Sequence, residues 1–186
     1  MTTLQTERLT LRPLAPGDAE AYAAMRYHPK VARWLPPPPV EPAEAVRNSI
    51  ERFAAGWRER GYAPWGIFRA GQLIGHGGLN YVPEFGETEV LWALHPRAWG
   101  RGYATETARA MIDYAFGKLG HEVLHSGARV SNSASRRVLE KCGFQWTGVQ
   151  LCRIRAINSA APIDRFRLDR RLWASLKAWG RERQVA

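Results

Sequence analysis

A turn rich in glycine and arginine, residues 97–104 (RAWGRGYA), joins a strand-like run to a helix-like run. The strand-like run is residues 88–94 (TEVLWAL), and the helix-like run continues to about Phe116. A turn that opens a helix has unpaired backbone N–H groups, and the helix dipole adds partial positive charge at the same point. Because Arg97 and Arg101 add full charges, the segment predicts a β-turn-α unit that binds a pyrophosphate.

The remaining sequence predicts strands and helices around this unit. Apolar runs bounded by turn residues indicate strands at residues 9–14, 65–70, 73–79, 88–94, 123–131, 149–155 and 163–169. Apolar residues at helical spacing, with capping and stop signals, indicate helices near residues 18–25, 42–60, 100–116 and 132–142 and in the basic C-terminal region. Pro36–Pro39 predict an extended linker. The order of elements predicts a mixed sheet flanked by helices, a fold of the α/β class.

The composition indicates a globular protein with one core. The chain has 186 residues, 45% of them hydrophobic and 24% charged, which fits a single domain over residues 1–186. It has no run of about 18 apolar residues, and its start (MTTLQTERL) has no signal-like core, so we expect neither a membrane span nor a secretion signal. Cys142 and Cys152, without a CxxC or Cys/His cluster, argue against a metal site or a disulfide scaffold. A cytoplasmic location is expected.

The chain is strongly basic, with a formal net charge of +10. Residues 153–186 contain nine basic and three acidic residues and so contribute +6 of that charge. Such a bias is compatible with nucleic acid, an acidic protein partner, a phosphorylated ligand, or only a solvated basic face. No RNA- or DNA-binding signature accompanies it, so direct binding to nucleic acid is not expected.

Two motifs coincide in this sequence. The first is Arg97-x-x-Gly100-x-Gly102-x-Ala104 after a strand, and the second, about thirty residues later, is residues 132–144 (NSASRRVLEKCGF). Together they resemble the acetyl-CoA-dependent GNAT N-acetyltransferases. Residues 6–14 (TERLTLRPL) and the stretch ASRRVLEKCGF resemble the ribosomal-protein N-terminal (RimJ/RimL-type) branch of that family.

The resemblance implies a GNAT fold and a binding site for coenzyme A. The sheet would be mixed, mostly antiparallel and twisted, with about seven strands, of which strands 88–94 and 123–131 splay apart. The pantetheine arm would pair with the free backbone there, almost like an added strand. The pyrophosphate would rest on the amides of the turn, where Gly100 and Gly102 permit close approach. The implied cofactor-binding residues are Trp92, Ala93, Leu94, Arg97, Gly100, Arg101, Gly102, Tyr103, Ala104, Thr105, Asn132, Ser135 and Arg137, with Arg136 as an alternative to Arg137.

The resemblance also implies acetyl transfer to a primary amine by direct attack through a tetrahedral intermediate. An α-amine has a pKa of about 7.7–8.0, so it needs only a modest base, whereas a lysine amine at about 10.4 is almost wholly protonated. An amide near Ala93 or Leu94 would stabilise the oxyanion. Leu139 stands where many members have a tyrosine that protonates the thiolate, and Ser135 matches a serine proposed for that role in the ribosomal-protein branch.

Glu89 is the predicted general base, because related enzymes often use an acidic side chain on this strand. Glu87, His76 and Tyr81 lie on neighbouring segments and remain alternatives, and a solvated strand-edge carboxylate is the simpler interpretation of Glu89. By strand alternation Glu89, Leu91 and Ala93 share one face, but the sequence does not say which face meets the acceptor.

The leading hypothesis is therefore an acetyl-CoA-dependent N-acetyltransferase without a metal. Its acceptor would be the α-amine of a protein or peptide N-terminus, or a small-molecule amine. A non-catalytic acyl-CoA-binding module and a basic protein associated with ribosomes or RNA are the two alternatives. No membrane partner is expected, and the chain is a monomer or a homodimer; the sequence leaves the acceptor and the true base open.

Overall fold

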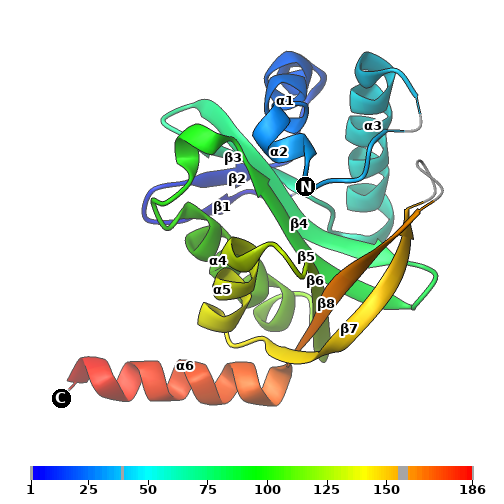
Figure 1. Cartoon of the computed structure of the whole chain (residues 1–186). Helices are drawn as coiled ribbons and strands as arrows, with labels where there is room; N and C mark the ends of the chain where they lie inside the picture. Colours follow the sequence, from blue (N-terminus) through cyan, green and yellow to red (C-terminus); the bar gives the residue numbers. More distant parts are fainter. Residues whose placement is uncertain (1, 39, 155–158, 186) are drawn as a thin grey trace.

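The computed structural model describes residues 2–38, 40–154 and 159–185, and within these ranges one sheet contains eight strands (Figure 1). In chain order they are β1 Leu4–Gln5, β2 Thr10–Arg12, β3 Trp65–Arg69, β4 Gln72–Val82, β5 Glu87–Leu94, β6 Val123–Arg129, β7 Gln145–Ile154 and β8 Ser159–Asp169. Their order in space is β1-β2-β3-β4-β5-β6-β8-β7. Neighbouring strands are antiparallel except β5 and β6, which are parallel. The mixed, mostly antiparallel sheet is thus confirmed.

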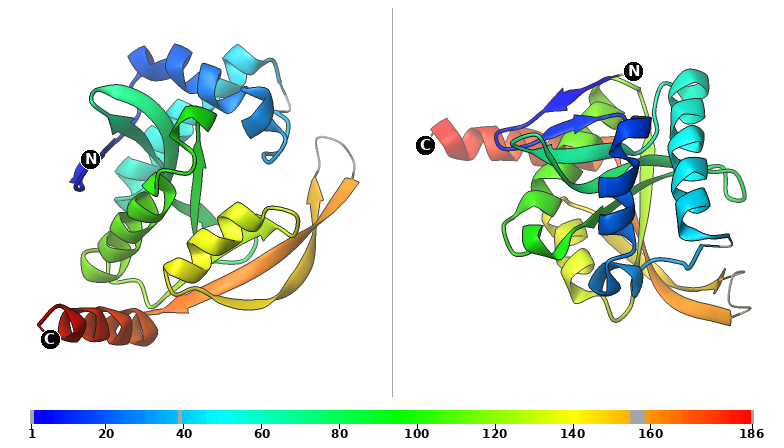
Figure 2. Two further views of the ribbon diagram at one scale, coloured as in Figure 1. Left: turned by 60° about the vertical axis from the view of Figure 1, so that its left-hand side comes forward. Right: turned by 90° about the horizontal axis from the view of Figure 1, so that it is seen from above.

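Helices lie on both sides of this sheet (Figure 2). They are α1 Ala19–Arg26, α2 Pro29–Ala32, α3 Pro42–Arg60, α4 Tyr103–Gly117, α5 Ser133–Lys141 and α6 Arg170–Val185, with short 3-10 turns η1 Pro16–Asp18 and η2 Pro96–Ala98. Helices α1 to α3 lie on one side, and α4 and α5 lie on the other. Helix α6 packs on α4, where the rings of Trp173 and Phe116 are 5.3 Å apart.

The contacts of His76 on β4 identify which strand faces meet which helices. Its ring lies 5.3 Å from the ring of Tyr22 on α1 and 6.3 Å from that of Phe53 on α3, so it faces the α1–α3 side. His76 is directly opposite Ala93 in the β4–β5 ladder. Residues opposite one another in a ladder share a face and side chains alternate along a strand, so Glu89 and Ala93 also face the α1–α3 side.

The sheet is nearly interrupted between β5 and β6. The ladder between these strands has a single pair, Glu89 with His125, and the Ser126 hydroxyl adds a hydrogen bond of 2.7 Å to the Val90 carbonyl. Beyond this point the ladder stops, and β5 residues 91–94 have pairs only with β4 in the part of the chain that the structure describes. We call this unpaired stretch the seam. The predicted splaying of these two strands is therefore confirmed.

The structure also differs from the sequence-based expectation in short elements. Strand β1 and helix α2 are too short to give a periodic signal, and β1 raises the number of strands to eight. The helix expected from about Gly100 begins at Tyr103 instead, because Gly100 and Gly102 have the left-handed φ values of 72° and 79°. Pro39, in the expected linker, and residue 155, at the end of an expected strand, lie outside the described residues.

The predicted apolar face of α4 forms the centre of the core. Ala108, Met111 and Ala115 on this helix are fully buried, and Ile112 is 2% exposed. Among the described residues, no helix combines the length and apolar character needed to cross a bilayer. The packed face of α4 holds its N-terminus at the C-terminal end of β5, where the predicted anion site lies.

Candidate active site

The turn between β5 and α4 has the backbone shape that its glycines predict. Chain order after Leu94 is His95, the short turn η2, extended Trp99, and then Gly100 to Gly102 before α4 begins. The left-handed conformation at Gly100 and Gly102 costs an L-residue with a Cβ roughly 1–2 kcal/mol. A Cβ on Gly100 would meet nothing within 4 Å, so its backbone conformation, rather than crowding inside the protein, requires glycine there.

Backbone amides at the end of this turn have no partner in the described part of the protein. The amides of Arg97, Ala98 and Trp99 donate within the turn, to the His95 ring, the His95 carbonyl and the Pro96 carbonyl. The first α4 amide with a carbonyl partner is that of Glu106, which donates to Gly102 at 3.0 Å. The amides of residues 100–105 therefore remain available to an anion at the helix N-terminus. This narrows the predicted seat, which began at Arg97, to residues 100–105.

A group of side chains from the N-terminal segment fixes this turn. Arg8 contacts the Glu106 carboxylate at 2.6 Å, donates to the Arg101 carbonyl at 3.0 Å, and lies over the Tyr103 ring at 4.6 Å. The Thr6 hydroxyl also donates to Glu106, at 2.6 Å. Partial burial opposes ionisation of Glu106, but these hydrogen bonds outweigh it and lower its pKa. Arg8 and Thr6 therefore hold the first turn of α4 through Glu106. Arg8 also holds the preceding turn through the Arg101 carbonyl, next to the amides that would bind the anion.

The four predicted cationic side chains differ in their availability. Arg97 donates from its guanidinium to the Leu73 carbonyl at 3.1 Å, and Arg136 contacts the buried Asp164 carboxylate at 3.2 Å. Arg101 and Arg137 are exposed, and no described residue forms an ion pair with either. Of the two arginines considered on α5, Arg137 is therefore the one that is free to approach a phosphate.

Strand β5 presents alternate backbone groups to the seam. A Cβ on Gly75 would lie 2.5 Å from the Ala93 carbonyl oxygen, and the His95 amide donates to Ile74, so odd-numbered backbone groups face β4. The groups of Trp92 and Leu94 therefore face the opposite way, toward the seam. Consistent with this, the Leu94 carbonyl accepts a hydrogen bond of 2.7 Å from the Trp99 indole. The structure thus brings Trp92 and Leu94, but not the backbone of Ala93, to the predicted pantetheine path.

Helix α5 begins beside the same end of the sheet. Asn132, which follows β6, caps it by accepting the Ser135 amide at 3.2 Å on its side-chain oxygen. Because β5 and β6 are parallel, the helices that follow them both start at the carboxyl ends of the strands, where open α/β sheets bind ligands. Ser135 is half-buried in the first turn, and Leu139, one turn later, is 1% exposed and belongs to the core.

Glu89, the predicted base, is paired with an arginine from another strand. Arg165 on β8 donates to Glu89 at 2.6 Å and to Glu87 at 2.8 Å, and His125 lies 3.5 Å from Glu87. Burial, assisted by Arg165 and Arg167 and opposed by the two carboxylates, lowers the pKa of His125, so this imidazole is neutral at pH 7. The Glu89 carboxylate is therefore held by a charge-assisted hydrogen bond to Arg165 rather than left free on the strand.

His76 differs from Glu89 in having no polar partner among the described residues. It is 7% exposed between Tyr22 and Phe53, and its Nδ1 is buried without a hydrogen bond. Burial, with further repulsion from Arg26 and Arg52, lowers its pKa to about 3. The ring is therefore neutral at physiological pH. The third alternative base, Tyr81, is 39% exposed near the hairpin end of β4, opposite Thr88 and away from the seam.

Comparison of the sequence with models of known protein families assigns the chain to one of them. The model of the Acetyltransferase (GNAT) domain matches residues 8–145, which include the turn, the seam and the whole of the second motif. The chain belongs to the GNAT acetyltransferase family.

Individual GNAT relatives agree with this assignment. The uncharacterized N-acetyltransferase YoaA of Bacillus subtilis is 33% identical over 78% of this chain and 84% of its own length. The FsC-acetyl coenzyme A-N(2)-transacetylase of Aspergillus fumigatus is 31% identical over 76% of this chain and 64% of its own. The crystal structure of an acetyltransferase from Agrobacterium tumefaciens has a TM-score of 0.75 and 32% identity, covering 90% of this chain and 94% of that one. This GNAT protein is thus an N-acetyltransferase by family.

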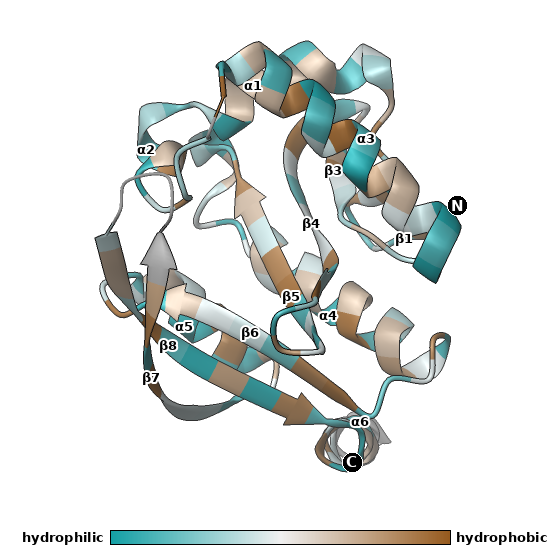
Figure 3. Ribbon diagram, turned by 90° about the vertical axis from the view of Figure 1, so that its right-hand side faces the viewer, coloured by the Kyte–Doolittle hydropathy of each residue, from teal (hydrophilic) through white to brown (hydrophobic). Residues whose placement is uncertain are grey.

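Two ion pairs near the candidate site were not predicted from the sequence, because their partners are far apart along the chain. Arg8 with Glu106, and Arg165 with Glu89, are separated by 98 and 76 positions, and their pairing follows only from the strand order. Lone arginines and glutamates in a basic chain carry no signal of such pairing. The one available hint for Arg165 was its alternation with Phe166, Arg167 and Leu168, which predicts one polar face on β8 (Figure 3).

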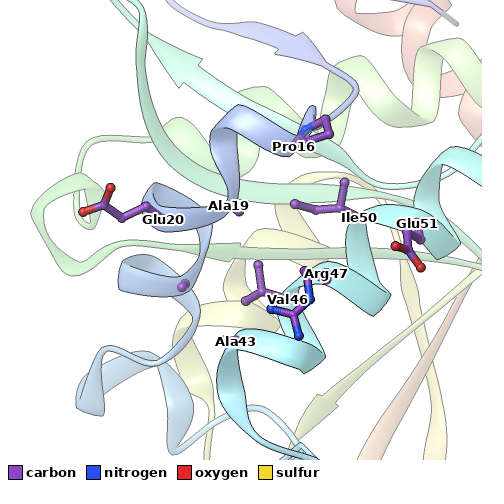
Figure 4. Close-up of a pocket in the computed structure, with 9 residues that line it drawn as sticks. Pro16, Ala19, Glu20, Ala43, Val46, Arg47, Ile50 and Glu51 are labelled. Carbon is purple, nitrogen blue, oxygen red and sulfur yellow. The ribbon is translucent and has the colours of Figure 1, made fainter.

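A hollow of about 440 Å³ lies away from the seam, between α1 and α3 (Figure 4). Its walls are mostly apolar, from Ala19 on α1 and Val46 and Ile50 on α3, with Glu20 and Glu51 at its rim. It shares no lining residue with β5, η2 or α4. It is therefore separate from the predicted donor site.

Proposed function

We propose that this protein transfers the acetyl group of acetyl-CoA directly to a primary amine. The observation that carries the proposal is the combination of six unpaired amides, on residues 100–105, with the seam beside β5. The amides suit a pyrophosphate, and the seam offers backbone groups to an extended amide-containing arm. Membership of the GNAT family and a relative named for acetyl coenzyme A support the same donor.

The residues at the turn fit coenzyme A in charge as well as in shape. The α4 dipole and the exposed Arg101 and Arg137 supply positive charge, while Arg8 balances Glu106 in the first turn. The seam-facing carbonyl of Trp92 would accept from a pantetheine amide, since the Leu94 carbonyl already accepts from the Trp99 indole. Asn132 keeps its side-chain nitrogen for the same arm, because its oxygen is used as the helix cap.

The chemistry is a nucleophilic attack by the neutral amine on the thioester carbonyl. The seam-facing amides of Trp92 and Leu94 are the proposed donors to the oxyanion, since the Ala93 amide faces β4. Ser135 in the first turn of α5 is the proposed partner of the departing thiolate. Direct transfer is favoured over an acyl-cysteine, because burial raises the pKa of Cys142 to about 11 and leaves it a poor nucleophile.

The general base remains a prediction. Glu89 is on the strand face that meets α1–α3, but its carboxylate is engaged in an ion pair with Arg165 at 2.6 Å. An α-amine with a pKa of about 7.7–8.0 is partly neutral already, so water can accept its proton. We therefore propose an α-amine acceptor, on a protein or peptide N-terminus or a small molecule, and the resemblance to the ribosomal-protein branch supports the former.

The test is an acceptor screen that follows thiol release from acetyl-CoA. Peptides with free α-amines, the same peptides with a blocked N-terminus and an internal lysine, polyamines and aminoglycosides form the panel. Turnover with free α-amines and none with the blocked peptides is expected. Binding of acetyl-CoA without thiol release from any amine would instead favour a non-catalytic acyl-CoA-binding module. The cytoplasmic location and the single domain over residues 1–186 stay predictions.

A further inference from the structure

The point where β5 and β6 part is held by side chains on both faces of the sheet. The ladder itself contributes one pair, Glu89 with His125. On the α4 side the buried Ser126 hydroxyl donates to the Val90 carbonyl at 2.7 Å. On the α1–α3 side Arg165 donates to Glu89 at 2.6 Å and to Glu87 at 2.8 Å. Side-chain bonds therefore replace the missing ladder.

Arg165 reaches β5 by crossing the intervening strand. It belongs to β8, and it is opposite Gly127 of β6 in the β6–β8 ladder. A Cβ on Gly127 would lie 3.4 Å from an Arg165 guanidinium nitrogen, so the guanidinium passes over β6 close to this glycine. Phe85, from the turn before β5, has its ring centroid 5.8 Å from the guanidinium carbon on the same group.

The two hydrogen bonds from Arg165 to Glu87 and Glu89, which we call the fork, are better defined than an ordinary surface ion pair. The Arg165 side chain is 16% exposed, and those of Glu87 and Glu89 are 26% and 21% exposed. Arginine bonds two carboxylates with two different nitrogens, which fixes the direction as well as the distance. By contrast Arg167, two residues later on β8, is 43% exposed and pairs with its neighbour Asp169 on the same strand. Only Arg165 of these two connects β8 to β5.

We propose that Arg165 is a positioning residue for the donor site: its fork to Glu87 and Glu89 sets the spacing between β5 and β6 where the seam begins. Beyond this point Trp92 and Leu94 must keep their backbone groups at the right distance for the pantetheine arm. Without the fork, the polar links between β5 and the β6–β8 unit in the described part of the chain are one ladder pair, the Ser126 bond and the 3.5 Å contact of His125 with Glu87. Glu89 then acts through Arg165 as an anchor and takes no proton from the acceptor.

The proposal rests on the proposed function only for the identity of the ligand, coenzyme A. The test compares Arg165→Met, Glu89→Gln and the double variant, with Arg167→Met as a matched loss of charge on the same strand. Titration calorimetry with coenzyme A gives Kd, and acetyl transfer gives kcat at saturation. Thermal unfolding shows that each variant is folded at the assay temperature.

A positioning role predicts that Arg165→Met weakens coenzyme A binding about tenfold, while kcat at saturation changes less than threefold. Glu89→Gln replaces the charge-assisted hydrogen bond to Arg165 by a neutral one, so it weakens coenzyme A binding in the same direction as Arg165→Met but by less, about threefold. The double variant is no weaker than Arg165→Met alone, because both changes act on one link. Arg167→Met leaves Kd unchanged, and Arg165→Lys, which keeps the charge without the fork, lies between parent and Arg165→Met.

Two results would overturn the proposal. One is a folded Arg165→Met protein that binds coenzyme A within twofold of the parent. The other is a loss of kcat by 100-fold or more in Glu89→Gln with unchanged Kd, which is the result expected for a general base. If Arg165→Met does not fold, Ser126→Ala tests the same point from the opposite face and should weaken binding severalfold. Because Kd is measured without an acceptor, absence of thiol release would count against the proposed function alone.

Discussion

The proposed donor side and the predicted acceptor side of this molecule differ in the groups that form them. The proposed donor side consists mainly of backbone: amides of residues 100–105 and seam-facing groups of Trp92 and Leu94. The predicted acceptor side consists of side chains, with Glu89 bonded to Arg165 and His76 buried without a hydrogen bond on its Nδ1. A backbone site requires glycines and helix starts at fixed spacing, and these are visible in a sequence. A side-chain site depends on which residues the topology brings together, so its assignment needs the fold.

The largest expected effect would break the donor side. Gly102→Asp places a Cβ at a left-handed φ of 79° and a negative charge beside the phosphate seat. We expect affinity for coenzyme A to fall by at least about 100-fold, roughly 3 kcal/mol, measured by titration calorimetry. Gly117→Asp is the matched control, because Gly117 is at the other end of α4 in an ordinary conformation with open space around it. Unchanged affinity in a folded Gly102→Asp protein would contradict the seat.

The second prediction concerns His76 on the predicted acceptor side and the dependence of protein stability on pH. Its pKa is lowered from 6.5 to about 3 in the folded protein, by burial first and then by Arg26 and Arg52. Above pH 6.5 neither state binds this proton; below it the unfolded state does and the folded state does not. The free energy of unfolding therefore decreases as the pH is lowered below 6.5, by about 1.4 kcal/mol per pH unit for this one site, until about pH 3.

His76→Phe should remove that contribution, because a phenyl ring can pack between Tyr22 and Phe53 without binding a proton. Urea unfolding at pH 7, 6 and 5 measures the slope. His95, His121 and His125 also have lowered pKa values, mainly through burial, so a smaller slope of the same sign should remain. An unchanged slope would show that His76 is protonated in the folded state. Retained acetyl transfer in this variant would exclude His76 as the base.

A third prediction concerns Ser135, where the donor side depends on a side chain. Ser135→Ala should lower kcat about tenfold, roughly 1.4 kcal/mol, with little change in KM for acetyl-CoA, because its hydroxyl would act on the departing thiolate only. Ser133→Ala is the control, since Ser133 is exposed at the start of the same helix. Equal effects of the two substitutions on kcat would assign Ser135 to helix stability instead.

The smallest expected effect is that of Arg137. Arg137→Ala should raise KM for acetyl-CoA about threefold at low salt and less at 0.5 M salt, since exposed charges are screened. Lys141→Ala removes the same charge from the other end of α5 and should leave KM unchanged. If Arg137→Ala and Lys141→Ala change KM equally, the positive charge of the whole chain explains the effect. The predicted contact of Arg137 with a phosphate would then be wrong.

Much of the fold was predictable because long elements have strong periodic signals. The helix ending at Gly61, the hairpin of β3 and β4, and Asn132 as the cap of α5 are all as expected. Two-residue β1 and four-residue α2 were not predictable, since they span too little sequence to show a period. Their places are fixed by neighbouring strands and helices.

The donor residues were predictable in kind, but their backbone direction was not. Ala93 and Arg97 could be named from the sequence as part of the predicted site, yet the Ala93 backbone faces β4 and the Arg97 amide bonds to His95. The phase of a strand ladder depends on the partner strand and is not encoded in the strand alone. For the same reason Glu89 could be named as a carboxylate on the strand before the turn, while its partner Arg165 could not be named.

The backbone character of the seam has a consequence for how such an enzyme diverges. The seam-facing groups of Trp92 and Leu94 belong to the backbone, so the proposed donor recognition would depend on the path of β5 more than on the identity of its side chains. The α1–α3 side can then change its charges and shape without rebuilding the donor site. One scaffold can in this way keep a single acetyl donor while its acceptors drift apart in chemistry, with glycine at positions 100 and 102 as the fixed requirement.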